Sequence, residues 1–508
     1  MSQRSVHVAV PGTRAIEPRA DLKPGPGESN HRPGPRPRST WAIRVLLLYI
    51  VLLPVHSLII AILLSHAGVP VRVLRVFAAW KEVLLFLTAT GLVGAVVLRK
   101  ELPRLVWVDW VALAWFVQVL LYLGLRNWFL SQSLGWETNL YGARDWMLYV
   151  IPYVIGRLIV ASDLDLLTVF RVLLAVATVT SAVGLLEYFF VPTQWHLAIG
   201  IPRYFSEFLN LRYPSTWGLP NNYWQIVGYQ LVRRAVSVHI SGQGFAIPFL
   251  LLWPLCILNL RARWFRGAVL LVALNGAGVI FSLTRMTIFV CFLQGLMVLW
   301  MIGRRYLLLP YLAVTVIVAA LFVADLVPLR LEKPEAAPPK AVTPFQRVPF
   351  NELVSNTARL NDSSSRARPG QWTAGWGVLR EHPAGIGLGA TGITAGRVGA
   401  GGMGNEAGYL KVAGALGVPG LLIFLGWFAG VIRASWAVWR AADAPWHNLA
   451  ILAFATAIGS LINNVTAPPD QSLFIGYLFP WLAGMTVARW AQIRATTGRP
   501  GLAGRVAN

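Results

Sequence analysis

Long runs of apolar residues recur along almost the whole chain. Each run is about 20 residues long, enough for an α-helix to cross the ~30 Å hydrocarbon core of a bilayer. We expect helices because they pair all their backbone groups inside lipid, and the runs do not alternate as barrel strands do. The pattern predicts an all-α polytopic membrane protein with about twelve transmembrane helices. The predicted spans are 43–65, 75–97, 105–125, 145–161, 166–190, 244–260, 264–282, 286–303, 306–327, 409–432, 447–466 and 472–490.

Basic residues in the short connections predict the orientation, because Lys and Arg are enriched on the cytoplasmic side. The connections that carry most arginines fall on one side if both termini are cytoplasmic. We therefore predict a multi-pass protein of the bacterial inner membrane. Two long segments, 191–243 and 328–408, then face outward, and the second is a large periplasmic loop between the ninth and tenth spans.

The predicted organisation follows from these spans. A disordered cytoplasmic tail, rich in Pro and Arg, covers 1–40, and nine spans with the outer loop 191–243 cover 41–327. The periplasmic loop with an amphipathic helix covers 328–408. The last three spans cover 409–490, and a cytoplasmic tail covers 491–508.

Composition supports a membrane protein and narrows its partners. Hydrophobic residues make up 56% of the chain and charged residues only 13%, where a soluble protein has about 25% charged residues. The net charge of +23 lies largely beside the spans, where anionic lipid explains it, so we expect the lipid bilayer and no nucleic acid as partners. Cys256 and Cys291 lie within spans and are interpreted as apolar filler. Neither a metal nor another cofactor is expected.

Four arginines fall on the side that the positive-inside bias disfavours. They are Arg234, Arg285, Arg366 and Arg368. A guanidinium group suits bidentate recognition of phosphate. These residues therefore predict an anionic substrate, carried on a lipid diphosphate and handled at the outer face of the membrane.

The second outer segment contains a predicted amphipathic helix over 366–383. Trp372, Trp376 and Leu379 recur at helical spacing, and Pro383 marks the end. Such a helix lies on the membrane surface or covers a cavity. The glycine-rich stretch from Gly385 to Gly404 is expected to form a mobile or substrate-hugging loop.

In order along the chain, these elements resemble the O-antigen ligase and polymerase superfamily of bacterial surface polysaccharide synthesis. The resemblance covers roughly residues 40–490 and is most specific in the Trp–His-Pro–Gly stretch. The motifs are Arg234-Ala-x-Ser, Ser282-x-x-Arg285, Arg368-x-x-x-Trp372, His382-Pro383-x-Gly385-x-Gly387-x-Gly389, Tyr409-Leu410 and Gly414-x-x-Gly417-x-x-Gly420.

The resemblance implies a helical membrane enzyme that takes a glycan from an undecaprenyl-diphosphate carrier. A ligase attaches the glycan to lipid A-core, and a polymerase attaches it to another lipid-linked repeat. The outer-face arginines would hold the diphosphate, a role that maps to Arg234, Arg285 and Arg368, with Arg366 as a substitute for the last. A flippase and a chain-length regulator are possible protein partners.

The chain departs from the ligase pattern just before Tyr409. Ligases carry a His-Asn pair there, whereas this chain has Asn405-Glu406. Glu406 could act as the general base for an acceptor hydroxyl, or it could be a solvated loop residue. The change favours a polymerase over a ligase.

Charged residues inside the spans are further candidates, because burying charge in a bilayer is costly. Lys81 and Glu82 interrupt the second span; adjacent residues point to different faces of a helix, so we do not expect a simple pair. Lys81 either snorkels or reaches the diphosphate, and Glu187 is a possible partner for an arginine. Arg144 and Arg157 are open to structural and functional interpretations. A polysaccharide or lipid-glycan transporter is the alternative from another class, although the halves show no internal repeat.

Overall fold

A computed structural model describes residues 40–125, 135–211, 215–227, 230–332, 345–347, 363–392, 395, 407–468 and 472–497. The long helices of this part are α1 (Thr40–Ser65), α3 (Trp80–Leu98), α4 (Trp107–Gly124), α6 (Trp136–Leu158), α7 (Asp163–Phe190), α11 (Phe249–Ala262), α12 (Ala268–Phe281), α13 (Arg285–Met301), α14 (Leu308–Val323), α16 (Ser363–Glu381), α18 (Gly408–Ala441), α19 (Trp446–Asn463) and α20 (Leu473–Thr497). The short ones are α2 (Val71–Ala78), α8 (Thr193–Ala198), α9 (Ile201–Arg203), α10 (Gly242–Ala246), the π-helix η1 (Tyr204–Phe208) and the 3₁₀ helices η2 (Asn221–Tyr223), η3 (Ser237–His239) and η4 (Arg305–Leu307).

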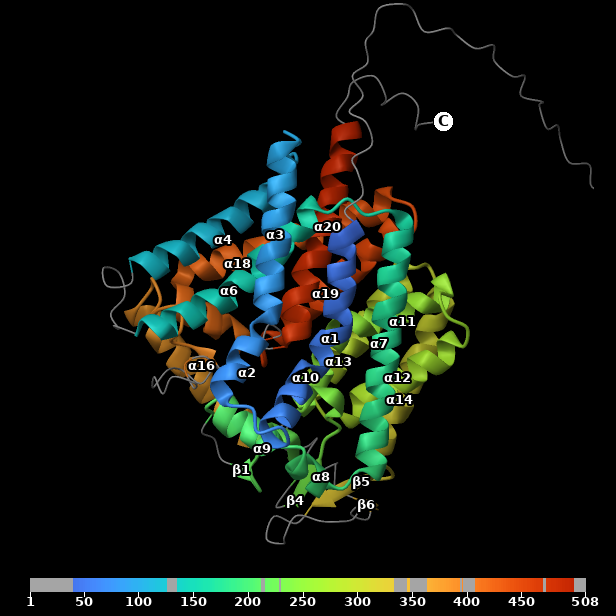
Figure 1. Cartoon of the computed structure of the whole chain (residues 1–508). Coiled ribbons are helices and arrows are strands. Elements are labelled where there is room, and N and C mark those ends of the chain that lie inside the picture. Colours follow the sequence, from blue (N-terminus) through green and yellow to red (C-terminus); the bar gives the residue numbers. More distant parts are fainter. Residues whose placement is uncertain are drawn as a thin grey trace, which may run out of the picture. The chain divides into compact units, whose positions relative to one another are not determined.

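The helices confirm the predicted fold class. Each predicted apolar run overlaps one long helix, although the run 75–97 begins in α2 and continues in α3, and Figure 1 shows the long helices gathered into one bundle. In the described residues, 8 helices are long and apolar enough to cross a membrane, and α12 and α13 are shorter apolar helices. The main difference is α6, which starts at Trp136, well before the predicted start at residue 145.

The bundle has a buried centre and a lipid-like exterior. Helices α6 and α20 approach closely through glycines: a Cβ on Gly156 would meet the Met485 amide nitrogen at 3.0 Å, and one on Gly484 would meet the Arg157 amide nitrogen at 2.9 Å. Helix α14 is the opposite case, since none of its residues is buried. Its exposed leucines and valines suit contact with acyl chains.

A small antiparallel sheet, which the sequence did not predict, joins the two long segments that are predicted to face outward and are called the outer segments below. It contains β3 (Trp224–Val227), β4 (Gln230–Arg233), β5 (Pro328–Glu332) and β6 (Phe345–Arg347), in the order β3-β4-β5-β6. Val232 of β4 pairs with Leu331 of β5. A separate hairpin is formed by β1 (Ser215–Thr216) and β2 (Leu219–Pro220). Because β4 comes from segment 191–243 and β5 from segment 328–408, both segments lie at the same end of the bundle (Figure 1).

The connections predicted to be cytoplasmic also contact one another. Trp446 Nε1, at the start of α19, donates to Asp163 Oδ1 at 3.1 Å, and Arg261 Nη1 donates to the Ile302 carbonyl at 3.2 Å.

Arg157 forms an ion pair with Asp109 at 2.7 Å, so it ties α6 to α4. This pair gives Arg157 a structural role.

Candidate functional site

Arg234 lies at the outer-segment end of the bundle, directly after β4. Its side chain is half-buried, and Nη2 donates a hydrogen bond to Gln225 Oε1 at 2.8 Å. The side chain also lies against Gly242, where an added Cβ would meet Arg234 Cδ at 2.7 Å. Gly242 therefore leaves the space that the arginine occupies.

Arg285 is the half-buried first residue of α13. Ser282 closes the preceding turn, because its Oγ accepts a hydrogen bond from the Thr284 amide at 3.3 Å. A cation at this position is electrostatically unfavourable by about 0.3–1 kcal/mol, since a helix N-terminus already carries positive partial charge. A bound anion would interact favourably with both the guanidinium group and the helix end.

The segments that carry these two arginines lie side by side. The Ala235 amide donates to the Phe281 carbonyl at 2.9 Å, and Thr284 Oγ1 donates to the Gly242 carbonyl at 3.4 Å. Arg234 directly precedes Ala235, and Arg285 directly follows Thr284. Both arginines are therefore neighbours in sequence of residues that form these contacts. The side chains of Arg366 and Arg368 are outside the described part, so their predicted convergence with this pair stays a prediction.

The start of α18 lies close to the start of α13. The Gly408 amide donates to the Asn464 carbonyl at 2.7 Å, and Thr287 Oγ1 of α13 donates to Asn463 Oδ1 at 3.3 Å. Both helices therefore begin against the end of α19. Glu406 and Asn405, which directly precede this position, lie outside the described residues. Tyr409 is half-buried, and its hydroxyl donates to the Leu461 carbonyl at 2.6 Å.

Helix α16 confirms the predicted helix in the second outer segment, although it starts at Ser363 and contains Pro369 inside. It packs on α18 through Gly375, where an added Cβ would meet Leu410 Cδ1 at 2.8 Å. Leu379 is buried, Trp372 is partly buried and Trp376 is 48% exposed. The aromatic face is therefore only partly covered by protein.

The His382–Gly389 stretch fills a break in α18. Gly417 has φ 70° and interrupts the helix, so the carbonyls before it need donors from elsewhere. Four hydrogen bonds cross the gap: Ile386 N to Gly414 O at 2.7 Å, Gly387 N to Ala415 O at 3.3 Å, Gln118 Nε2 to Leu416 O at 2.9 Å, and Val418 N to Pro383 O at 2.9 Å.

Residues 385–391 are all buried, which contradicts the mobile alternative for this loop; the substrate-hugging alternative stays a prediction. The glycines of this stretch permit close backbone approach. A Cβ on Gly385 would meet the Gly417 amide nitrogen at 2.6 Å, and one on Gly389 would meet Thr138 Cγ2 at 2.5 Å. These residues therefore hold α6 and α18 together.

Lys411, in the first turn of α18, was not among the predicted site residues. The residue is 7% exposed, and its Nζ lies 5.1 Å from the centre of the Trp146 ring. Thr391 Oγ1 donates to the Lys411 carbonyl at 3.1 Å. A desolvated cation over an indole interacts favourably. The position of Lys411 two residues after Tyr409, inside a predicted span, was the available signal.

The expectation that Lys81 and Glu82 do not pair is wrong. Lys81 Nζ lies 3.3 Å from Glu82 Oε2 and donates to the Ala78 carbonyl at 2.6 Å. The two long side chains bend toward each other, and the break at Ala79 places Lys81 in the first turn of α3, within reach of the Ala78 carbonyl. Arg144 joins the cluster, with Nη1 3.9 Å from Glu82 Oε1 and Nη2 2.7 Å from Asp145 Oδ1. Lys81 is buried here and does not snorkel.

An ionic network fastens the outer segments to α7. Arg233 is fully buried and pairs with Glu187, which confirms that Glu187 is the partner of an arginine. His196 Nε2 lies 3.0 Å from Glu187 Oε1, and its Nδ1 lies 2.6 Å from the Tyr223 hydroxyl. We call Glu187, His196 and Arg233, with the adjoining Arg330 and Glu332, the outer ionic network.

Burial governs the protonation of the outer ionic network. Desolvation lowers the pKa of His196 to about 4, with a further lowering from the nearby Arg233. Desolvation and the neighbouring Arg233 also lower the pKa of Arg330 to about 10. At neutral pH His196 is therefore an uncharged imidazole.

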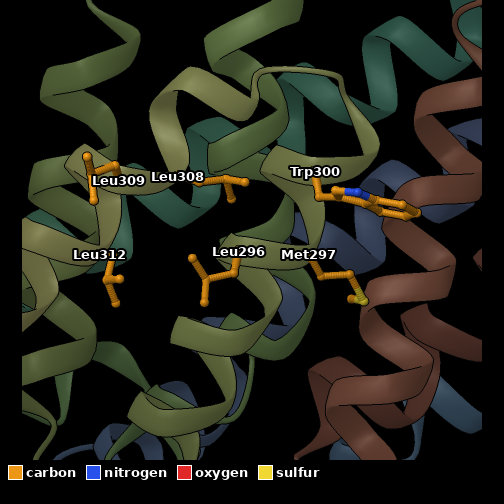
Figure 2. A pocket seen from close by; sticks show the side chains of 6 residues that line it. All are labelled: Leu296, Met297, Trp300, Leu308, Leu309 and Leu312. Atoms are coloured by element: carbon orange, nitrogen blue, oxygen red, sulfur yellow. The ribbon is translucent and has the colours of Figure 1, made fainter.

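Two cavities of ligand size lie away from Arg234 and Arg285. One has a volume of about 570 Å³ and is lined by apolar side chains of α13 and α14, which Figure 2 shows: Leu296, Met297, Trp300, Leu308, Leu309 and Leu312. The other has about 660 Å³ and lies at the predicted cytoplasmic end. Among the described residues, no group of three or more His, Cys, Asp or Glu could hold a metal ion.

The fold and the charged residues define a class: a polytopic helical membrane protein with basic side chains at the end where two long connections meet. Residues 268–425 match the family model described as O-antigen ligase. The match extends from α12 into α18, so it includes Arg285 and both glycine motifs. It confirms the resemblance to the O-antigen ligase and polymerase superfamily over this part of the chain. A search of curated proteins gives no match.

Proposed function

We propose that the protein is a membrane glycosyltransferase that polymerises undecaprenyl-diphosphate-linked oligosaccharide repeats. The product would be an exopolysaccharide, a capsule or an O-antigen, made at the outer leaflet of the bacterial inner membrane. The family match supports glycan transfer. The observation that carries the diphosphate site is the side-by-side placement of the segment that follows Arg234 and the segment that precedes Arg285.

In the proposed reaction, an acceptor hydroxyl oxygen attacks the anomeric carbon of the donor glycan. The sugar–phosphate bond breaks, and its electrons leave with the diphosphate on the carrier lipid. Arg234 and Arg285, with Arg366 or Arg368, stabilise the charge that develops on the diphosphate. Glu406 receives the hydroxyl proton. The proposed chemistry uses no metal ion.

Lys411 and the Lys81–Glu82–Arg144 cluster are proposed to assist from inside the bundle. The buried Lys411 adds positive charge to the first turn of α18, five residues after the proposed base in the sequence. Buried ionisable groups in a bilayer commonly mark substrate pathways. Trp372, Asn405 and Tyr409 remain proposed accessory residues on the same side.

A ligase that transfers the glycan to lipid A-core or another acceptor is the second candidate. The description of the matching family as O-antigen ligase favours it. The replacement of the ligase His-Asn pair by Asn405-Glu406 favours the polymerase. The two differ only in the acceptor, so the product decides between them.

The test is the product made by purified protein from a lipid-linked repeat, with lipid A-core as a competing acceptor. A ladder of lipid-linked oligomers is the polymerase outcome, and glycan on lipid A-core alone is the ligase outcome. Glu406→Gln should lower the rate about 10²–10⁴-fold, because Gln cannot accept the proton. Normal product from a stably folded Glu406→Gln protein would remove Glu406 from the mechanism. Absence of transfer to either acceptor by the wild-type protein would contradict the proposed function.

A further inference from the structure

We propose that the cavity at the predicted cytoplasmic end binds the headgroup of an anionic phospholipid. The cavity has a volume of about 660 Å³, within the range of about 300–1,000 Å³ that small-molecule sites occupy. It is formed by the start of α7, the end of α11 and the connection between α18 and α19. None of the lining residues belongs to the proposed diphosphate site, so the proposal does not rest on the proposed function.

Three arginines line the cavity from two helices. Arg171 stands on α7, and Arg261 and Arg263 stand at the end of α11. Two carboxylates, Asp163 and Asp443, also line it. Asp163 already accepts the hydrogen bond from Trp446 Nε1 at 3.1 Å. The lining therefore carries three positive and two negative side chains, and this excess of one positive charge matches a single phosphodiester.

Contacts between the lining residues and their neighbours fix the wall of the cavity. Trp264 stacks on Phe170 with ring centres 4.9 Å apart, which fixes the end of α11 against α7. Asn259 Oδ1 accepts a hydrogen bond from the Phe265 amide at 3.2 Å and so closes the turn beside Arg263.

His447 supplies a further polar group to the lining. Its Nδ1 lies 2.9 Å from the Trp439 carbonyl. A carbonyl only accepts, so Nδ1 carries the proton. With the proton on Nδ1, Nε2 of His447 is an acceptor and does not donate to a phosphate oxygen. The donors around this space are the three guanidinium groups and the amide side chain of Asn448, and these suit phosphate oxygens.

A lipid is the occupant that the location favours. The lining residues belong to connections between helices. The distribution of arginines predicts that these connections lie at the cytoplasmic surface, where anionic lipids are concentrated. Trp264 and Trp446 at this level are typical of the interface between headgroups and acyl chains. A headgroup bound here would bridge α7, α11 and the α18–α19 connection. Because Lys411 lies in α18 and Asn464 directly follows α19, both at the opposite end of these helices, occupancy would stabilise the helices beside the proposed diphosphate site.

The test uses the full-length protein in nanodiscs with phosphatidylglycerol or phosphatidylcholine. Native mass spectrometry counts the retained lipids, and the melting temperature reports stabilisation. The variants are Arg171→Gln alone and the triple Arg171→Gln, Arg261→Gln and Arg263→Gln. Arg99→Gln is the matched control, because Arg99 is exposed at the end of α3 and does not line the cavity.

We expect the wild-type protein to retain phosphatidylglycerol in preference to phosphatidylcholine. At about 1 kcal/mol per arginine, affinity should fall about 5-fold in the single variant and ~100-fold in the triple variant, with no change in Arg99→Gln. Equal retention of the two lipids by wild type would overturn the proposal without any variant. An equal loss in Arg99→Gln would overturn it as a non-specific charge effect. Stabilisation by glycerol phosphate or inorganic phosphate alone, lost in the triple variant, would replace the lipid by a soluble ligand.

Discussion

Arg233 and Arg234 are adjacent in sequence and occupy two different electrostatic environments. Arg233 is fully buried and paired with Glu187, beside His196. Arg234 is half-buried and donates to the neutral side chain of Gln225. Successive residues of an extended segment point to opposite sides, so one arginine faces the outer ionic network and the other faces Gly242.

The comparison distinguishes a charged side chain that stabilises the fold, Arg233, from one that can bind a substrate, Arg234. A buried ion pair is costly to break, because removing one partner leaves an uncompensated charge in low dielectric. A half-buried arginine retains access to an incoming anion. We therefore expect changes in the outer ionic network to affect stability first, and changes at Arg234 and Arg285 to affect activity first.

The largest predicted effect is the loss of stability in Glu187→Gln. This change leaves Arg233 charged and buried, and should cost about 3–5 kcal/mol. The measurement is the melting temperature in detergent and the yield of folded protein. Arg234→Gln is the matched control and should melt close to wild type. Equal destabilisation by the two changes would erase the distinction between the two arginines.

The next effect is a pH dependence that comes from His196. Its pKa in the folded protein is about 4, below the ordinary value near 6.5. Its contribution to stability is therefore complete above pH 6.5 and is lost as the pH falls toward 4. Between pH 7 and pH 5 the loss should be about 2 kcal/mol.

The pH effect is measured as the difference in melting temperature between pH 7 and pH 5. Subtracting the same difference for His196→Gln removes the carboxylates that titrate in both proteins. Wild type should lose more stability than the variant. The same pH dependence in both would show that His196 is not held neutral by the outer ionic network.

The smallest predicted effect is that of Arg285→Lys. Lysine keeps the charge but loses the planar fork that binds two phosphate oxygens at once. Activity should fall by about tenfold or more, with an unchanged melting temperature. The assay is polymer formed per protein molecule by the purified enzyme. Full activity in the lysine variant would mean that charge alone suffices at this position.

The helical part of the fold was predictable because lipid imposes a simple rule. A run of about 20 apolar residues has few structures available other than a spanning helix. The same rule predicts nothing about the outer segments, where β3 and β4 are part of an aromatic-rich stretch without strict alternation. Strands β4 and β5 pair residues that are about 100 positions apart in the sequence. A local sequence pattern cannot predict such a pairing.

The candidate site was predictable residue by residue but not as an arrangement. Arg285 and Glu187 stood out because charge is rare beside an apolar run. Lys411 directly follows the Tyr409-Leu410 motif, and only Tyr409 of this stretch was predicted as a site residue. The break in α18 at Gly417 was not predicted. The carbonyls of Gly414 and Ala415 before the break accept hydrogen bonds from the amides of Ile386 and Gly387, some 30 residues earlier, and a local sequence pattern does not reveal such distant partners.

The most direct test of the central claim is the affinity of the purified protein for a polyprenyl-diphosphate-linked glycan. The double variant Arg234→Gln/Arg285→Gln should bind the donor at least about 100-fold more weakly than wild type, since hydrogen bonds to a charged phosphate contribute about 1.5–3 kcal/mol each. The control Arg99→Gln should bind like wild type, and all three proteins should melt alike. Wild-type affinity in a folded double variant would contradict the claim that these two arginines hold the diphosphate.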